Sequence, residues 1–237
     1  MTRSAQNPWD FFDRLFCISL EERTDRRMRA TAEFQRLGIL DRVEFVLVKK
    51  HPEDACQGIF ESHILCMDRA LAGQAKNVVI FEDDVIFHRY SPVTLDLCAE
   101  YLSANPDWTM LFFGCLIRGC STAGRPGIKT IRYHALTHAY AVNREFAEVI
   151  RKQPWTGVPY DVVLRNLGPA YLGATPFFAF QSNAATDNDA CRDLDRVRRL
   201  FGGLRTIQTM NECFHSHRAA IIIGHLAALG LLGMWLW

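Results

Sequence analysis

The stretch Val78-Val79-Ile80-Phe81-Glu82-Asp83-Asp84 sets four apolar residues directly before three acidic ones. A short apolar run of this kind is typical of a strand that is buried on both faces of a sheet. In open α/β sheets, ligands bind beyond the carboxyl ends of the strands. Carboxylates clustered there favour a hard divalent cation, and such a cation binds phosphate oxygens. The alternative for the motif alone is an acidic turn in contact with solvent.

Apolar runs alternate with helical patterns on both sides of this stretch. Gly38 follows the first expected helix as a terminating glycine, and Pro92 stands in the first turn of the third. This alternation predicts an α/β fold with a mostly parallel sheet and helices on both faces. The expected strands cover 15–20, 43–48, 78–81, 110–113, 128–133, 138–142 and 171–180, and the expected helices cover 24–37, 58–71, 92–103, 144–152, 160–167 and 189–200.

The chain has 237 residues, of which 49% are hydrophobic and 22% charged, a balance typical of a folded globular protein. Because no internal repeat or long linker is present, we expect one domain over 13–205, followed by a C-terminal hydrophobic helix over 219–237. Lys and Arg number 27 and Asp and Glu number 26, which argues against nucleic-acid binding through bulk charge. The eight cysteines are scattered without a C-x-x-C pair, which favours free thiols in a reducing compartment over disulfides or a zinc ribbon.

The last segment, 219–237, reads AAIIIGHLAALGLLGMWLW and contains no Asp, Glu, Lys or Arg. As a helix it would be roughly 28 Å long, close to the hydrocarbon thickness of about 30 Å. Trp235 and Trp237 lie at its far end and Arg218 precedes it. The segment therefore predicts a single-pass C-terminal anchor, with the main domain at the cytoplasmic face of a membrane. The alternatives are a buried helix of the domain and a dimer contact, and His225 would be costly inside a bilayer.

Three blocks of the first half form a recognisable series. In chain order they are Cys17-Ile18-Ser19-Leu20 with Arg23, Asp25 and Arg26; Gly58-Ile59-Phe60-Glu61-Ser62-His63; and the strand over 78–85 that ends in Glu-Asp-Asp-Val. The series resembles glycosyltransferase family 25, the family of lipopolysaccharide galactosyltransferases and of collagen hydroxylysine galactosyltransferases. Weaker similarity follows at 138–143 and 159–161. Ser19, Ile59 and Asn143 depart from the family's Asn, Cys and Ser.

The resemblance implies a GT-A fold and the transfer of a hexose, usually galactose, from a UDP-sugar to a glycan or lipid-linked acceptor with inversion, as in lipopolysaccharide biosynthesis. It also implies a manganese or magnesium cofactor, which Asp84 and a late residue, Asp187 or Asn183, would hold. The resemblance also assigns the binding of the UDP-sugar donor to a larger set of residues. They are Ser19, Leu20, Arg23, Arg26, Ser62, His63, Glu82 and Asp83.

Several of these assignments have a structural alternative. Asp161, in the acceptor half, is the candidate general base for the acceptor hydroxyl, or else the N-cap of the helix that follows it. Arg23 and Arg26 either bind pyrophosphate by bidentate hydrogen bonds or lie at a solvated helix start. Ser62 and His63 either line the donor pocket or belong to the core.

A second class of function is a catalytically inactive GT-A-like protein that binds a nucleotide sugar or a glycan and is tethered to a membrane. The intact acidic motif favours the enzyme. A P-loop or dinucleotide-binding enzyme is excluded because residues 20–23, after the first strand, contain no glycine. The resemblance, together with the acidic motif, therefore implies a metal-dependent hexosyltransferase with a UDP-sugar donor, and the charge balance predicts no nucleic-acid partner.

Overall fold

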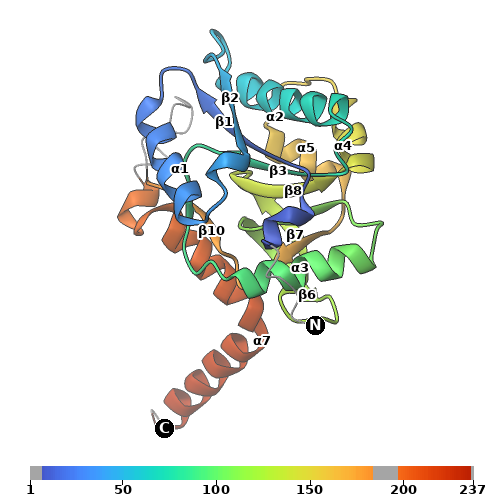
Figure 1. Cartoon of the computed structure of the whole chain (residues 1–237). Coiled ribbons are helices and arrows are strands. Elements are labelled where there is room, and N and C mark those ends of the chain that lie inside the picture. Colours follow the sequence, from blue (N-terminus) through green and yellow to red (C-terminus); the bar gives the residue numbers. More distant parts are fainter. Residues whose placement is uncertain (1–6, 184–196, 236–237) are drawn as a thin grey trace.

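An eight-stranded sheet forms the centre of the computed structural model, which describes residues 7–183 and 197–235 (Figure 1). Its strand order is β2-β1-β3-β8-β5-β9-β7-β6, and a smaller sheet pairs β4 with β10. The strands are β1 Arg14–Leu20, β2 Val43–Val48, β3 Asn77–Glu82, β4 Val85–Phe87, β5 Met110–Phe112, β6 Leu116–Thr122, β7 Ile128–Ala135, β8 Ala139–Asn143, β9 Tyr171–Ala174 and β10 Ala179–Gln181.

Most strands of the large sheet run in the same direction. β1 is parallel to β2 and β3, and β5 is parallel to β9, while β7 and β8 run opposite to their neighbours. The mostly parallel sheet that the alternation predicts is therefore confirmed, with the reversed strands in the second half of the chain. β6 was not expected, because Arg118, Gly119 and Ser121 interrupt its apolar pattern.

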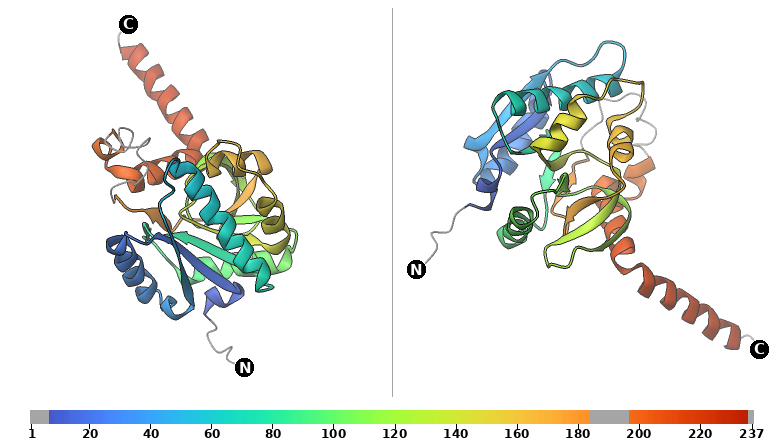
Figure 2. Two further views of the ribbon diagram at one scale, coloured as in Figure 1. Left: turned by 90° about the horizontal axis from the view of Figure 1, so that it is seen from above. Right: turned by 90° about the vertical axis from the view of Figure 1, so that its right-hand side faces the viewer.

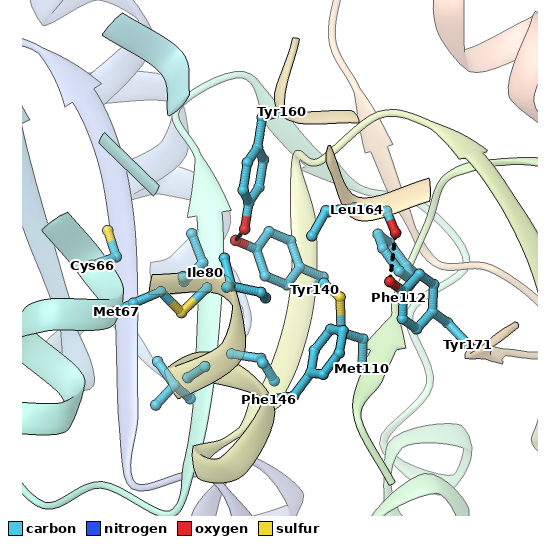
Figure 3. Packing of buried hydrophobic residues seen from close by; sticks show 14 of the residues in the cluster. Cys66, Met67, Ile80, Met110, Phe112, Tyr140, Phe146, Tyr160, Leu164 and Tyr171 are labelled. Atoms are coloured by element: carbon cyan, nitrogen blue, oxygen red, sulfur yellow. Dashed lines mark hydrogen bonds between the residues drawn. The ribbon is translucent and has the colours of Figure 1, made fainter. Parts of the chain in front are cut away.

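Helices cover both faces of the large sheet (Figures 1 and 2). One core cluster, which includes Ile80 and Tyr140, packs under α2, α4 and α5 (Figure 3), and the other, which includes Val79 and Phe81, packs under α1 and α3. Successive residues of β3 thus point to opposite apolar faces, as expected for a buried central strand. The helices are α1 Thr24–Arg36, α2 Ala55–Ala72, α3 Pro92–Ala104, α4 Arg144–Arg151, α5 Tyr160–Leu167 and α7 Gly203–Trp235, with 3₁₀ turns η1 Pro8–Phe11 and η2 Leu40–Arg42.

Gly114 lies where the end of β5 meets β10 at close range. A Cβ atom at this position would be 1.7 Å from the carbonyl oxygen of Ala179 and 2.6 Å from Nε2 of Gln208 in α7. Only a glycine fits there, because any side chain would overlap backbone atoms of β10. From this close approach onward, β10, which has Gln181 at its end, pairs with β4.

α7 consists of two parts that meet at a kink at His217, where φ is −121° and ψ is 19°. The first part packs against β6 and β10, and the second projects away from the body of the protein (Figures 1 and 2). The described part of the hydrophobic helix expected over 219–237 is the part of α7 that follows the kink, up to Trp235. Over the residues whose side chains the structure describes, 7–183 and 197–228, no helix is long and apolar enough to cross a membrane, so the expected single-pass anchor is not supported.

Candidate active site

A pocket of about 380 Å³ lies at the carboxyl ends of β1 and β3. Further walls come from α2, from the residues between β7 and β8, from the start of α5 and from the residues after β10. The pocket brings together most of the site residues that the sequence predicts. They are Ser19, Leu20, Arg26, Ser62, His63, Glu82, Asp83, Asp84 and Asp161.

The remaining predicted residues are placed differently. Arg23 lies before the first turn of α1 and is not among the residues that line the pocket; its Nε lies 2.9 Å from Oδ1 of Asp25. Asp187 lies outside the residues that the structure describes. The side chain of Asn183, the other late metal ligand expected, packs against Gly203.

Arg26 reaches the acidic motif from α1. Its NH1 atom lies 3.4 Å from Oδ1 of Asp83 and 3.8 Å from Oδ2 of Asp84. Both acids are buried, and burial raises the pKa of each of them despite the nearby guanidinium. When both carboxylates are ionised, this one guanidinium balances only half of their charge.

Asp84 is the acid whose surroundings best fit a cation ligand. Its Oδ2 accepts a 2.7 Å hydrogen bond from Nε2 of Gln181, but its buried Oδ1 has no hydrogen-bond partner among the described residues. Burial, followed by repulsion from Glu82, raises the pKa of Asp84 to about 7. A buried carboxylate oxygen without a partner is costly, and a divalent cation would satisfy it.

The protein offers a cation only a partial set of ligands. In the part of the chain that the structure describes, no three His, Cys, Asp or Glu side chains are grouped so as to hold a metal ion. A closed structural metal site needs about four protein ligands, whereas magnesium is commonly bound by one or two carboxylates together with substrate phosphates. The residues therefore fit a cation that binds together with a phosphate-bearing ligand.

Glu82 is held by two side chains at the base of the pocket. Its Oε1 accepts a 2.6 Å hydrogen bond from Oγ1 of Thr137 and lies 3.5 Å from Nε2 of His63. Burial acts to raise the pKa of Glu82, but His63 and then Thr137 outweigh it, so this pKa is lowered. His63 is fixed in turn, because its Nδ1 lies 2.9 Å from the Tyr140 hydroxyl and its ring stacks on Tyr160 at 4.3 Å. Figure 3 shows the hydroxyl groups of Tyr140 and Tyr160 next to each other. His63 therefore lines the pocket and also packs in the core.

Asp161 lies in the first turn of α5, whose N-cap is Pro159. The N-cap alternative for Asp161 is therefore wrong, and its Oδ1 instead accepts a 2.6 Å hydrogen bond from the Tyr133 hydroxyl. Burial raises the pKa of Asp161, and the hydrogen bond from Tyr133 opposes part of this rise. A carboxyl group with a raised pKa at a pocket wall is a candidate proton acceptor.

Other pocket residues were not predicted. Thr137 and Gln181 contact the acidic motif, although both are far from it in the sequence, and Gln181 arrives through the pairing of β10 with β4. Lys49, Lys50 and His51 line the pocket from the loop after β2. This basic run was the one available signal, because adjacent cations after an expected strand favour a phosphate-bearing ligand.

Comparisons with known proteins give a likeness of fold. No family model matches the sequence, and no curated protein matches it either, so family 25 in particular is not supported. Solved structures do match, among them A197 from STIV, with 11% identity and a TM-score of 0.49 over 71% of this chain and 85% of that one.

Two further matches are to enzymes. One is a glycosyltransferase involved in the glycosylation of the major capsid of PBCV-1, with 12% identity and a TM-score of 0.42 over 66% of this chain and 77% of that one. The other is a UDP-glucose pyrophosphorylase complexed with UDP-glucose, with 10% identity and a TM-score of 0.40 over 68% of this chain and 72% of that one. At these values the likeness concerns the chain path alone and says nothing about activity.

Proposed function

We propose that this chain is a metal-dependent glycosyltransferase that takes a hexose, with galactose as the first candidate, from a UDP-sugar. The observation that supports the proposal is the meeting of Glu82, Asp83, Asp84, Arg26 and Asp161 in one pocket at the end of the central strand. The pocket volume of about 380 Å³ falls within the range of about 300 to 1,000 Å³ that small-molecule sites occupy.

Asp84 would hold the cation, and Asp187 stays a predicted second ligand. When bound, manganese or magnesium would neutralise the charge that grows on the leaving diphosphate. Lys49 and Arg198 lie around the same pocket and would hold the phosphate oxygens by charge-assisted hydrogen bonds.

Asp161 would take the proton of the acceptor hydroxyl while that oxygen attacks the anomeric carbon and the UDP group leaves from the opposite side. The configuration at that carbon is then inverted. Because burial raises its pKa, Asp161 is a stronger base than an exposed carboxylate and suits this step. The acceptor would be a glycan or a lipid-linked saccharide, and a location at the cytoplasmic face of a membrane remains a prediction.

The first test is isothermal titration of UDP into the protein with and without manganese. We expect binding that requires manganese and that weakens at least about tenfold in Asp84→Asn. Asp96→Asn is the matched control, because Asp96 is an exposed acid on α3. UDP-galactose and other UDP-sugars would then be screened for hydrolysis.

Two outcomes would contradict the proposal in different ways. An absence of UDP binding under every metal condition would favour another nucleotide donor or a glycan-binding protein without catalysis. Binding that keeps its full manganese dependence in Asp84→Asn would show that the cation is held by other carboxylates.

A further inference from the structure

Residues 133–137, which we call the β7–β8 link, contact two carboxylates of the pocket. The hydroxyl of Tyr133 donates to Oδ1 of Asp161 at 2.6 Å, and Oγ1 of Thr137 donates to Oε1 of Glu82 at 2.6 Å. Glu82 ends β3 and Asp161 lies in the first turn of α5, so the two acids belong to elements that are far apart in the sequence. One short segment therefore connects both acids by direct hydrogen bonds.

The backbone of the β7–β8 link is unusual at Leu136, where φ is +77°. A leucine rarely adopts this left-handed conformation, and such residues persist where surrounding contacts hold them. The side chain of Leu136 lines the pocket, and its backbone favours the ionised form of Asp161. The strained residue thus stands between the two hydroxyl donors in the sequence.

The two carboxylates also influence each other. The charge of Glu82 contributes to the raised pKa of Asp161, which means that the two acids lie close enough to repel. Without the hydrogen bonds of the link, this repulsion would turn the side chains away from each other. The link opposes that movement because Tyr133 holds one acid and Thr137 the other.

We infer that the β7–β8 link is a positioning element, in which Tyr133 and Thr137 set the separation of Asp161 and Glu82 across the pocket. The roles of the two acids in transfer rest on the proposed function, whereas their positions do not. A base must lie within hydrogen-bond reach of the proton that it accepts. A displacement of about 1 Å costs up to about a hundredfold in rate, so loss of either hydroxyl should reduce turnover more than donor binding.

The first experiment needs no activity. Carboxyl groups of ¹³C-aspartate-labelled protein would be titrated by NMR, with the Asp161 signal assigned by its loss in Asp161→Asn. Tyr133→Phe should raise the pKa of Asp161, because a hydrogen bond to the ionised form is lost. Tyr171→Phe is the matched control, since its buried hydroxyl donates to the backbone oxygen of Leu164 instead. Equal Asp161 titrations in the two variants would overturn the inference for Tyr133.

The second experiment measures UDP-galactose hydrolysis, in which water is the acceptor, together with UDP affinity. We expect Tyr133→Phe and Thr137→Val to lower kcat at least about tenfold, while the Kd for UDP stays within about twofold in Tyr133→Phe. Thr137→Ser keeps the hydroxyl and should restore most of kcat. Unchanged kcat in Tyr133→Phe and Thr137→Val would overturn the inference. Failure of the unmodified protein to bind UDP would instead contradict the proposed function, and the NMR titration would still decide the positioning of Asp161.

Discussion

Asp84, two residues after the end of β3, and Glu212, in the first part of α7, are two carboxylates whose side chains have the same 8% exposure. The surroundings of Glu212 satisfy both of its oxygens. Oε2 accepts a 2.8 Å hydrogen bond from Arg89, and Oε1 accepts one of 2.8 Å from the backbone N–H of Phe177 and lies 3.6 Å from Nζ of Lys129. Asp84 shares one guanidinium with a neighbouring acid and keeps an oxygen without a hydrogen-bond partner among the described residues.

The difference separates a structural carboxylate from one that is placed for a ligand. A buried charge is stable only when hydrogen bonds and opposite charges replace its water. Glu212 has these partners at both oxygens and ties α7 to the sheet, whereas Asp84, among the described residues, has them only at Oδ2 and lies in a pocket. Neighbouring residues of α7 reinforce the tie, because Nε2 of Gln208 donates to the carbonyl oxygen of Ala179 and Asn211 bonds to the backbone of Ile117.

The largest effect is expected for Glu212→Ala. Removing one partner of a buried ion pair leaves the other uncompensated, so the free energy of unfolding should fall by about 3 kcal/mol or more. The free energy of unfolding is measured by urea denaturation, with circular dichroism as the signal. The control is Glu148→Ala, whose exposed pair with Arg144 should be worth less than about 0.5 kcal/mol. Similar losses in the two variants would remove the contrast between Glu212 and a surface acid.

A smaller loss is expected for Asn211→Ala. Its side chain accepts from the N–H of Ile117 at 2.8 Å and donates to the carbonyl oxygen of the same residue at 3.0 Å, as a neighbouring strand would. The substitution leaves both backbone groups of this edge strand without partners, so we expect a loss of about 1 to 2 kcal/mol in the same assay. Asn105→Ala, at an exposed bond to Tyr101, should cost less.

Asp84→Asn should have the opposite sign. Without divalent cations, the amide removes the repulsion by Glu82 and a buried charge, so the free energy of unfolding should rise by about 1 kcal/mol. Manganese with UDP should raise the melting temperature of the unmodified protein and leave that of the variant unchanged. A loss of stability comparable to that of Glu212→Ala would mean that Asp84 is structural and not a ligand.

The smallest effect is expected for a chain that ends after Arg218. The side chains described beyond the kink, at 219–228, are nearly all exposed and contribute little to the core. We therefore expect the free energy of unfolding to change by less than about 0.5 kcal/mol. A larger loss in urea denaturation would show that the projecting part of α7 stabilises the domain in solution.

The sequence could predict the strands and the residues at their ends, but it could not predict the hydrogen bonds between distant segments. Apolar runs identify β1, β2 and β3 because these strands are buried on both faces, and residues at their carboxyl ends necessarily converge. Ser19 and the acidic motif, both named as site residues from the sequence, do line one pocket in the structure. Hydrogen bonds between distant segments leave no such pattern, so the partners of Glu82, Asp84 and Asp161 were missed. Even the start of α2 was placed at Gly58 instead of Ala55, because the cap formed by Asp54 was overlooked.

The close approach at Gly114 has a consequence for mutational scans. No substitution there can be accommodated without moving Ala179, and the carbonyl oxygen of Ala179 also accepts the bond from Gln208. A shift of β10 would carry Gln181 away from Asp84 and loosen α7 at the same time. Gly114 does not line the pocket, yet in a screen that selects for ligand binding it should tolerate as little variation as the acids themselves.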